Sequence, residues 1–173
     1  TVNAQYDDDQ NTAEDVTSAA TATVTNVNDA GSVAISGTAT QGLTLTATVS
    51  DDDGVTGITY QWKRGSINIG TNSATYVLVQ DDVGSTITVN AQYDDDQNTA
   101  EDVTSAATAT VTNVNDAGSV AISGTATQGE TLTATVSDDD GATGTITYQW
   151  KRGSTNIGTN SATYVLVQDD VGS

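Results

Sequence analysis

The sequence predicts an all-β protein built from tandem antiparallel β-sandwich modules of about 87 residues each. Three observations favour this fold class. Apolar residues alternate with threonine and other polar residues through most of the chain, which is the period of a β-strand. Clusters of Gly, Asn, Asp and Ser separate the alternating stretches, as turns do. Long segments recur almost unchanged, which indicates modules strung in an array.

The repeat covers the whole chain. "VTNVNDAGSVAISGTATQG" begins at Val24 and again at Val111. The segment "TVNAQYDDDQNTAEDVTSAATATVTNVNDAGS" begins at Thr1 and again at Thr88, an offset of 87 residues. The copies differ at four places, which are Leu43/Glu130, Val55/Ala142, an inserted Thr145 and Ile67/Thr155. One period has the length of a small domain.

Each alternating stretch predicts one strand whose inward face carries the apolar residues. In chain order, the inward sets of the complete repeat are Val33 and Ile35; Leu43, Leu45, Ala47 and Val49; Ile58, Tyr60 and Trp62; Ile87, Val89, Ala91 and Tyr93; and Ala107, Ala109 and Val111. The stretch "ATYVLVQ" is apolar without a break, so its inward face stays open. Six or seven short strands in 87 residues predict an antiparallel sandwich.

The tryptophans and the cations have ordinary structural interpretations. Trp62 and Trp150 share the parity of the apolar residues before them, which favours a place in the core over a sugar-stacking surface. The only cations are two Lys-Arg pairs, at residues 63–64 and 151–152, and we expect them to pair with the acidic surface. Outward threonines resemble those of some ice-binding surfaces, but they are normal on strands.

Composition excludes several classes of function. The chain of 173 residues has 23 acidic and 4 basic residues and a net charge of −19, so nucleic acid is not an expected partner. It has no Cys and no His, which argues against disulfides, zinc sites and His-dependent catalysis. No apolar run reaches the roughly 20 residues of a membrane helix, and the first residues do not resemble a signal peptide. The chain is expected to be an internal part of something longer.

The linker "VTNVND" is expected to mark the module boundaries. Residues 1–26 would then be the last two strands of an incomplete module, 27–113 a complete module, and 114–173 the first strands of another incomplete module. The two incomplete ends are complementary, so we expect the first strands of one chain to complete the last module of the next. Neighbouring identical repeats, arranged head-to-tail, are therefore the expected partners.

The order of these motifs resembles a known family. "SVAISG", "TLTATVSDDDG", "ITYQWKRG", "TYVLVQDDVGSTITVNAQY" and "VTSAATATVTNVND" are similar to the bacterial immunoglobulin-like extender repeats of large RTX-type adhesins. Trp62 and Trp150 stand at the place of the buried tryptophan of the third strand, and "VTNVNDA" resembles the junctions of cadherin-like repeats. The chain lacks the cysteine pair of antibody domains and the glycine-rich nonapeptide repeat of RTX proteins. The resemblance implies spacers that hold a ligand-binding tip away from the cell and commonly bind calcium.

Acidic clusters predict a site for a hard cation at one pole of the sandwich. "DDDG" lies between the second and third strands and "YDDDQ" between the last two, and the linker reaches the same pole. Carboxylate and carbonyl oxygens are the ligands of Ca²⁺. Alternation favours Asp51 with Asp53 and Asp94 with Asp96 within the two triplets. With the linker and the rest of the second loop, the candidate ligands at this pole are Asn28, Asp29, Asp51, Asp53, Asp94, Asp96 and Glu101. The alternative is that these loops are simply solvated.

A second acidic group is expected at the opposite pole, where the chain leaves toward the next module. Its candidate ligands are Asp81, Asn115, Asp116, Asp138 and Asp140. A cation here could bridge two modules, because the linker is only a few residues long. The equally weighted alternative is that Asp81 and Asp169 only begin a turn and accept hydrogen bonds from backbone N–H groups.

These observations together predict a structural extender of a secreted adhesin on the bacterial cell surface, with roles in adhesion and biofilm and with calcium as its only cofactor. Near-identical modules make sense where their number sets a length. A sugar- or protein-binding module of the same fold is the alternative, and it would require exposed aromatic residues. An enzyme is not expected, because the paired carboxylates lie on solvated loops with no evident cleft.

Overall fold

The structure, a computed structural model, describes residues 1–173 and is all-β with antiparallel sheets. It contains two three-residue 3-10 turns and fourteen strands. In order these are β1 (Asn3–Asp7), β2 (Ala13–Thr17), β3 (Ser32–Ser36), β4 (Thr44–Ser50), β5 (Thr56–Arg64), β6 (Ile67–Ile69), β7 (Thr75–Val77), η1 (Gln80–Asp82), β8 (Ile87–Asp94), β9 (Ala100–Thr104), β10 (Ser119–Ser123), β11 (Thr131–Ser137), β12 (Trp150–Arg152), β13 (Thr155–Ile157), β14 (Thr163–Val165) and η2 (Gln168–Asp170). No helix is long and apolar enough to cross a membrane.

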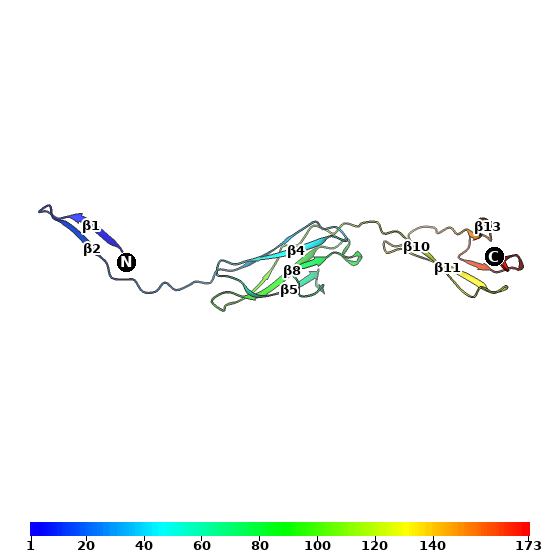
Figure 1. Cartoon of the computed structure of the whole chain (residues 1–173), viewed down its shortest axis with the longest axis horizontal. Helices are drawn as coiled ribbons and strands as arrows, with labels where there is room; N and C mark the ends of the chain where they lie inside the picture. Colours follow the sequence, from blue (N-terminus) through cyan, green and yellow to red (C-terminus); the bar gives the residue numbers. More distant parts are fainter.

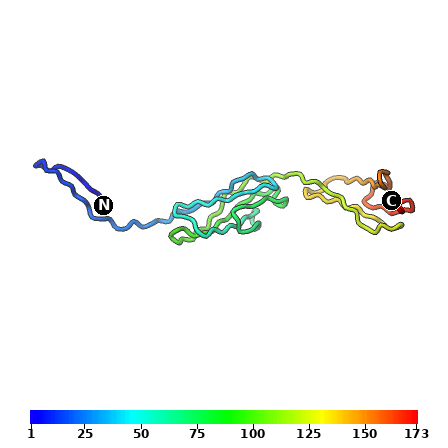
Figure 2. Tube along the Cα trace, in the orientation of Figure 1, coloured from blue at the N-terminus to red at the C-terminus, as the bar shows by residue number.

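The strands form three groups along an elongated molecule, with the two termini near opposite ends (Figure 1; Figure 2). β1 and β2 form an isolated hairpin, β3 to β9 form the central group, and β10 to β14 form the last group. The groups are separated by the strand-free segments 18–31 and 105–118. The expected boundaries after residues 26 and 113 lie within these segments, and the division into modules stays a prediction.

The central group consists of two sheets that enclose one apolar core. One sheet has the order β3-β4-β7 and the other β6-β5-β8-β9, with every pairing antiparallel. The core contains Val33, Leu45, Ala47, Trp62, Leu78, Ile87, Val89, Ala91 and Val111. The two faces therefore pack as in a β-sandwich, and the predicted core position of Trp62 is confirmed by its complete burial.

Most of the predicted inward faces are confirmed. The inward residues of β5 are buried or half-buried, and so are those of β3, while those of β8 are all buried. Leu43 is an exception, because it lies in the turn before β4 and is 47% exposed. The other repeat has Glu130 at this place, which is itself a sign of exposure. In the stretch "ATYVLVQ", whose inward face the sequence leaves open, the residues that face inward are Tyr76 and Leu78.

The prediction for Ala107 and Ala109 was wrong, because the chain bulges after β9. Ser105 N–H donates to the carbonyl of Val89, and Thr108 N–H donates to that of Ile87. Three residues after β9 thus lie opposite two residues of β8. The side chains that follow this bulge therefore face the other way from what alternation predicts. Ser105 is buried, both alanines are exposed, and Val111 returns to the core.

The end of the central group is tied to both sheets. Thr40 and Thr112 form a parallel β-bridge, flanked by hydrogen bonds from Gln41 N–H to the Thr112 carbonyl and from Thr112 N–H to the Ala39 carbonyl. On the other side, Val111 N–H donates to the Ser85 carbonyl. This segment therefore closes the sandwich just before the chain leaves it.

Candidate metal site at the acidic pole

The acidic pole of the central group is formed by residues 28–31, 51–54 and 95–101. The sequence places the first segment in the linker and the other two in loops between strands, and hydrogen bonds join all three. Asp29 N–H donates to Asp53 Oδ2 at 2.7 Å, and Asn28 Nδ2 donates to Glu101 Oε1 at 3.0 Å. Asp96 N–H donates to the Asp53 carbonyl at 3.1 Å. The expected convergence of linker and loops is thus present.

Asp51 is held in place by a tyrosine from the facing sheet. Its Oδ2 accepts a 2.7 Å hydrogen bond from the Tyr93 hydroxyl, and its Oδ1 accepts one of 2.9 Å from Asp53 N–H. Burial raises the pKa of Tyr93 well above its usual range, and the bond to Asp51 raises it further. The phenol therefore stays protonated and continues to donate to Asp51 at all physiological pH values.

Two glycines allow the three segments to approach so closely. A Cβ added at Gly31 would collide with the Tyr93 hydroxyl and lie 2.6 Å from Asp51 Oδ2. A Cβ at Gly54 would collide with the Asp96 carboxylate, and Gly54 has a φ of +97°, which side chains rarely adopt. The backbone at this pole is therefore compatible only with glycine at both places.

Sequence reasoning chose Asp94 and Asp96 from this loop and missed Asp95, which is the one that faces inward, whereas Asp94 and Asp96 are exposed. Asp95 is buried, and its Oδ1 accepts hydrogen bonds from the N–H groups of Gln97 at 2.8 Å and Thr99 at 2.6 Å. Its Oδ2 is buried and has no partner. The signal was available, because Asp95 lies two residues after the inward Tyr93. Asp94 is on the opposite, exposed face of the strand.

The residues of the acidic pole fit a hard cation in chemistry but are not gathered around one point. The donors are carboxylates and carbonyls, which suit Ca²⁺, and the unpartnered Asp95 Oδ2 is the kind of atom that a cation would satisfy. No three acidic side chains in the structure are close enough together to hold a metal ion. Backbone N–H groups occupy part of the carboxylate oxygens instead.

At the opposite pole, the predicted candidate Asp81 and its neighbour Asp82 have different roles. Asp81 is exposed, and its closest cation is Arg64, at 3.9 Å. Asp82 is fully buried, pairs with Arg64 at 3.0 Å, and accepts hydrogen bonds from the Tyr76 hydroxyl and from Val79 N–H. We expected, as an alternative, that Asp81 accepts a hydrogen bond from a backbone N–H of the turn, but the residue that does so is Asp82. The expected pairing of Arg64 with acidic residues is confirmed.

The junction to the last group is anchored by side chains from both sides. Gln41 Nε2 donates to Asp116 Oδ2 at 2.7 Å, and Gln41 Oε1 accepts from Val114 N–H at 3.0 Å. Asp116 N–H in turn donates to Asp140 Oδ2 at 2.7 Å. The anchoring of Asp29 by Asp53 is thus repeated one period later.

The other predicted ligands of the junction lie close by. Asp138 Oδ1 accepts from Asp140 N–H, and Asn115 Nδ2 donates to the Asp116 carbonyl. Asp140 Oδ1 is buried without a partner, as Asp95 Oδ2 is at the acidic pole. Asp81 makes no hydrogen bond to this junction, so the structure does not join it to the other four candidates.

Comparison with known proteins adds no relative. No family model, no curated protein and no solved structure matches the chain.

Proposed function

We propose that this chain is a stretch of structural extender repeats from a secreted bacterial adhesin, stiffened by calcium at its acidic loops and junctions. The observation that carries the proposal is the anchored junction. In both copies of the linker, an aspartate N–H donates a hydrogen bond to an aspartate carboxylate in the group of strands that follows. The bonds are Asp29 to Asp53 and Asp116 to Asp140, each 2.7 Å long. A linker held in this way sets the direction of the next module, which a spacer requires.

The charge of the chain gives calcium its role. Neighbouring carboxylates about 6 Å apart repel each other by roughly 0.5–1 kcal/mol per pair even in water. The three segments of the acidic pole carry seven carboxylates besides the amide of Asn28, namely those of Asp29, Asp51, Asp52, Asp53, Asp95, Asp96 and Glu101. Calcium, when bound, supplies the positive charge that offsets this repulsion. The chain's own contribution is to keep the three segments hydrogen-bonded and close together.

The first test of this function is a calcium titration of the 173-residue chain, followed by small-angle scattering and thermal melting. We expect millimolar calcium to raise the melting temperature and to extend the particle, because it relieves repulsion where the groups of strands meet. Magnesium at equal ionic strength controls for screening. A chain whose melting and dimensions ignore calcium would be a passive acidic spacer.

Substitutions locate the effect. Asp51→Asn with Asp53→Asn is expected to remove more of the calcium-dependent stabilisation than Asp81→Asn, because Asp81 is exposed and makes no hydrogen bond to either linker, whereas Asp53 binds Asp29 N–H. Asp95→Asn tests the buried, unpartnered oxygen. Equal losses from all of these variants would mean that calcium acts by general screening and has no defined site at the acidic pole.

A further inference from the structure

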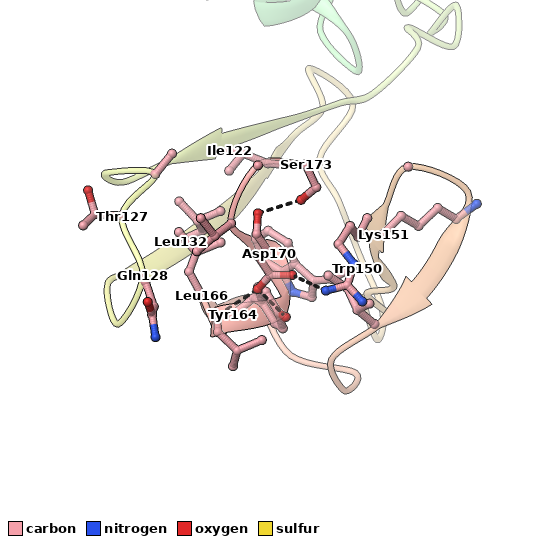
Figure 3. Close-up of a pocket in the computed structure, with 17 residues that line it drawn as sticks. Ile122, Thr127, Gln128, Leu132, Trp150, Lys151, Tyr164, Leu166, Asp170 and Ser173 are labelled. Carbon is pink, nitrogen blue, oxygen red and sulfur yellow. Dashed lines mark hydrogen bonds and ion pairs between the residues drawn. The ribbon is translucent and has the colours of Figure 1, made fainter.

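The last group of strands leaves an apolar groove open. The groove has a volume of about 580 Å³, and its apolar lining includes Ile122, Leu132, Trp150, Tyr164 and Leu166 (Figure 3). Figure 3 shows these residues around the groove, together with Asp170 and Ser173 near the end of the chain. The two-stranded sheet β12-β13 therefore covers only part of the apolar face of the sheet β10-β11-β14.

The central group shows what fills the same place. There β8 pairs with β5 and inserts Ile87, Val89 and Ala91, each of them completely buried. With β8 in place, Val33 is 8% exposed, while the identical Val120 of the last group is 65% exposed. The last group lacks counterparts of β8 and β9, which both contact β3 in the central group, whereas the sequences around the two valines are the same.

The missing strand also shortens its neighbour. β5 has nine residues, whereas its copy β12 has three, although the sequence "ITYQWKR" occurs in both. Residues 146–149 have the composition of a strand but no partner to pair with, so they do not form one. An unpaired edge above an apolar groove is a site for strand addition.

The isolated hairpin at the other end of the chain carries the complementary sequence. Residues 1–24 repeat residues 88–111 without a change, so β1 and β2 are copies of β8 and β9. Their apolar side chains are uncovered: Val2 is 67% exposed and Tyr6 is 54% exposed, whereas the equivalent Val89 and Tyr93 are 0% and 4% exposed.

We propose that the groove of the last group binds the β1–β2 hairpin of a second copy of this chain. The pairing of β5 with β8 gives the register, in which Val2 lies opposite Trp150, Asn3 opposite Gln149, and Ala4 opposite Tyr148. Residues 146–149 then become part of a long strand like β5. The interaction needs no calcium and does not rest on the proposed function.

The geometry makes this assembly linear. The hairpin and the groove lie at opposite ends of the molecule, with the central group between them (Figure 1). One chain therefore cannot fill its own groove, and each junction leaves a free hairpin and a free groove at the two ends. Head-to-tail contacts of this kind produce open filaments. In a longer polypeptide, a following copy of the strand would occupy the same groove.

The fit between chains lacks one side chain. The equivalent of Ile87, which is fully buried in the central group, would precede Thr1 and is not part of the sequence. We therefore expect that adding Thr-Ile in front of Thr1, as in Thr86–Ile87, tightens the association by about tenfold or more. Adding Thr-Asp instead is the matched control, and it should not tighten the association.

The experiment is sedimentation analysis of the 173-residue chain over a range of concentrations, in EDTA and moderate salt that screens the net charge. The unaltered chain is expected to associate into a ladder of linear oligomers. Ala4→Asp should weaken this by about 100-fold or more, because the equivalent Ala91 is fully buried. Ala13→Asp is the matched control, because Ala13 and its equivalent Ala100 are both exposed.

A mixing experiment tests both partners of the contact. Ile122→Asp blocks the groove, which Ile122 lines, and Ala4→Asp blocks the hairpin, so each variant alone should be monomeric. A mixture should form dimers and nothing larger, because only one productive contact remains. Hydrogen exchange should slow at residues 146–149 in the dimer. A monomeric unaltered chain at every concentration, or equal association by the Ala4→Asp and Ala13→Asp variants, would overturn the proposal.

Discussion

At the residue scale, the chain contains the same three side chains in two surroundings. Tyr76, Arg64 and Asp82 form a hydrogen-bonded cluster in the central group, and Tyr164, Arg152 and Asp170 form its copy in the last group. Burial, followed by the hydrogen bond to Asp82, raises the pKa of Tyr76 to about 12. The pKa of Tyr164 is raised mainly by its bond to Asp170, because less of the protein covers it.

This cluster predicts a loss of stability at alkaline pH. The folded-state pKa of Tyr76 lies above its ordinary value of 10.0, so the phenol contributes stability that is present below pH 10 and lost as the pH rises to about 12. We expect a loss on the order of 1–2 kcal/mol after allowance for partial exposure.

Urea unfolding across this pH range measures the loss. Tyr76→Phe should be about 1 kcal/mol less stable at neutral pH, because the hydrogen bond to Asp82 is gone, but it should lose less than the unaltered chain between pH 10 and 12. Tyr60→Phe is the control in the same group, since the Tyr60 hydroxyl makes no hydrogen bond. Parallel pH profiles for all three chains would contradict the assignment.

Individual residues differ in how far the sequence predicts their place. Trp62 and the acidic loop residues Asp51 and Asp53 follow from alternation, because the strands before them are regular. Asp95 follows from the same alternation once Tyr93 is known to face inward. The burial of Asp82 and its close pairing with Arg64 do not follow from the sequence, because they depend on the turn geometry of η1 and on Tyr76 of β7.

At the element scale, strand period and turn composition predict most strands of the central group. The bulge after β9 is not predicted, because the alternation of "VTSAATATV" breaks only at Ser105-Ala106-Ala107, where no Gly, Asn or Asp marks a bulge, and the extra residue is specified by pairing with β8. The inserted Thr145 has a partial explanation. It falls in the region where β5 changes register against β8, between Thr56 and Thr59, and a bulged strand accommodates an extra residue there.

The linker contact of Gln41 gives a prediction at this scale. Gln41 holds Val114 N–H and the Asp116 carboxylate with two hydrogen bonds, each worth about 1 kcal/mol. Gln41→Ala should therefore speed hydrogen exchange at Val114 by about tenfold in EDTA. Gln128→Ala is a matched control, because Gln128 has the same neighbours in sequence but makes no such contact. No change at Val114, or an equal change in the control, would show that the backbone alone orders the linker.

At the scale of the whole molecule, the repeat predicts the number and order of strand groups but not how complete each one becomes. The last group has the sequence of a module through its fifth strand, yet its β12 is short and its core is open. A closed core requires β8 and β9, which come last among the strands of the central group and cover its core. The acidic junctions follow from composition, whereas the anchoring role of Gln41 depends on contacts between groups.

The whole molecule is expected to carry no ligand-binding surface of its own, apart from the contacts between repeats. The aromatic residues of the central group face its core or are half-buried, so this group has no exposed ring to stack on a sugar, and the exposed Tyr6 has its equivalent, Tyr93, in the buried face of β8. A glycan and peptide screen with an array of these modules should therefore show no saturable binding. Sub-micromolar affinity for one ligand class would favour the alternative, a binding module, and would direct attention to residues 65–73 and 153–161.

The parallel bridge between Thr40 and Thr112 has a mechanical consequence. The chain enters the central group at one pole and leaves at the other, so a pull on the two ends drags residues 39–41 and 111–112 in opposite directions along their common axis. Their hydrogen bonds are then loaded in shear and must break together, whereas a hairpin pulled from its open end unzips one bond at a time. Resistance to force is set by the rate of unfolding under load. A tether with this patch in every repeat would hold its length under drag until the patch ruptured.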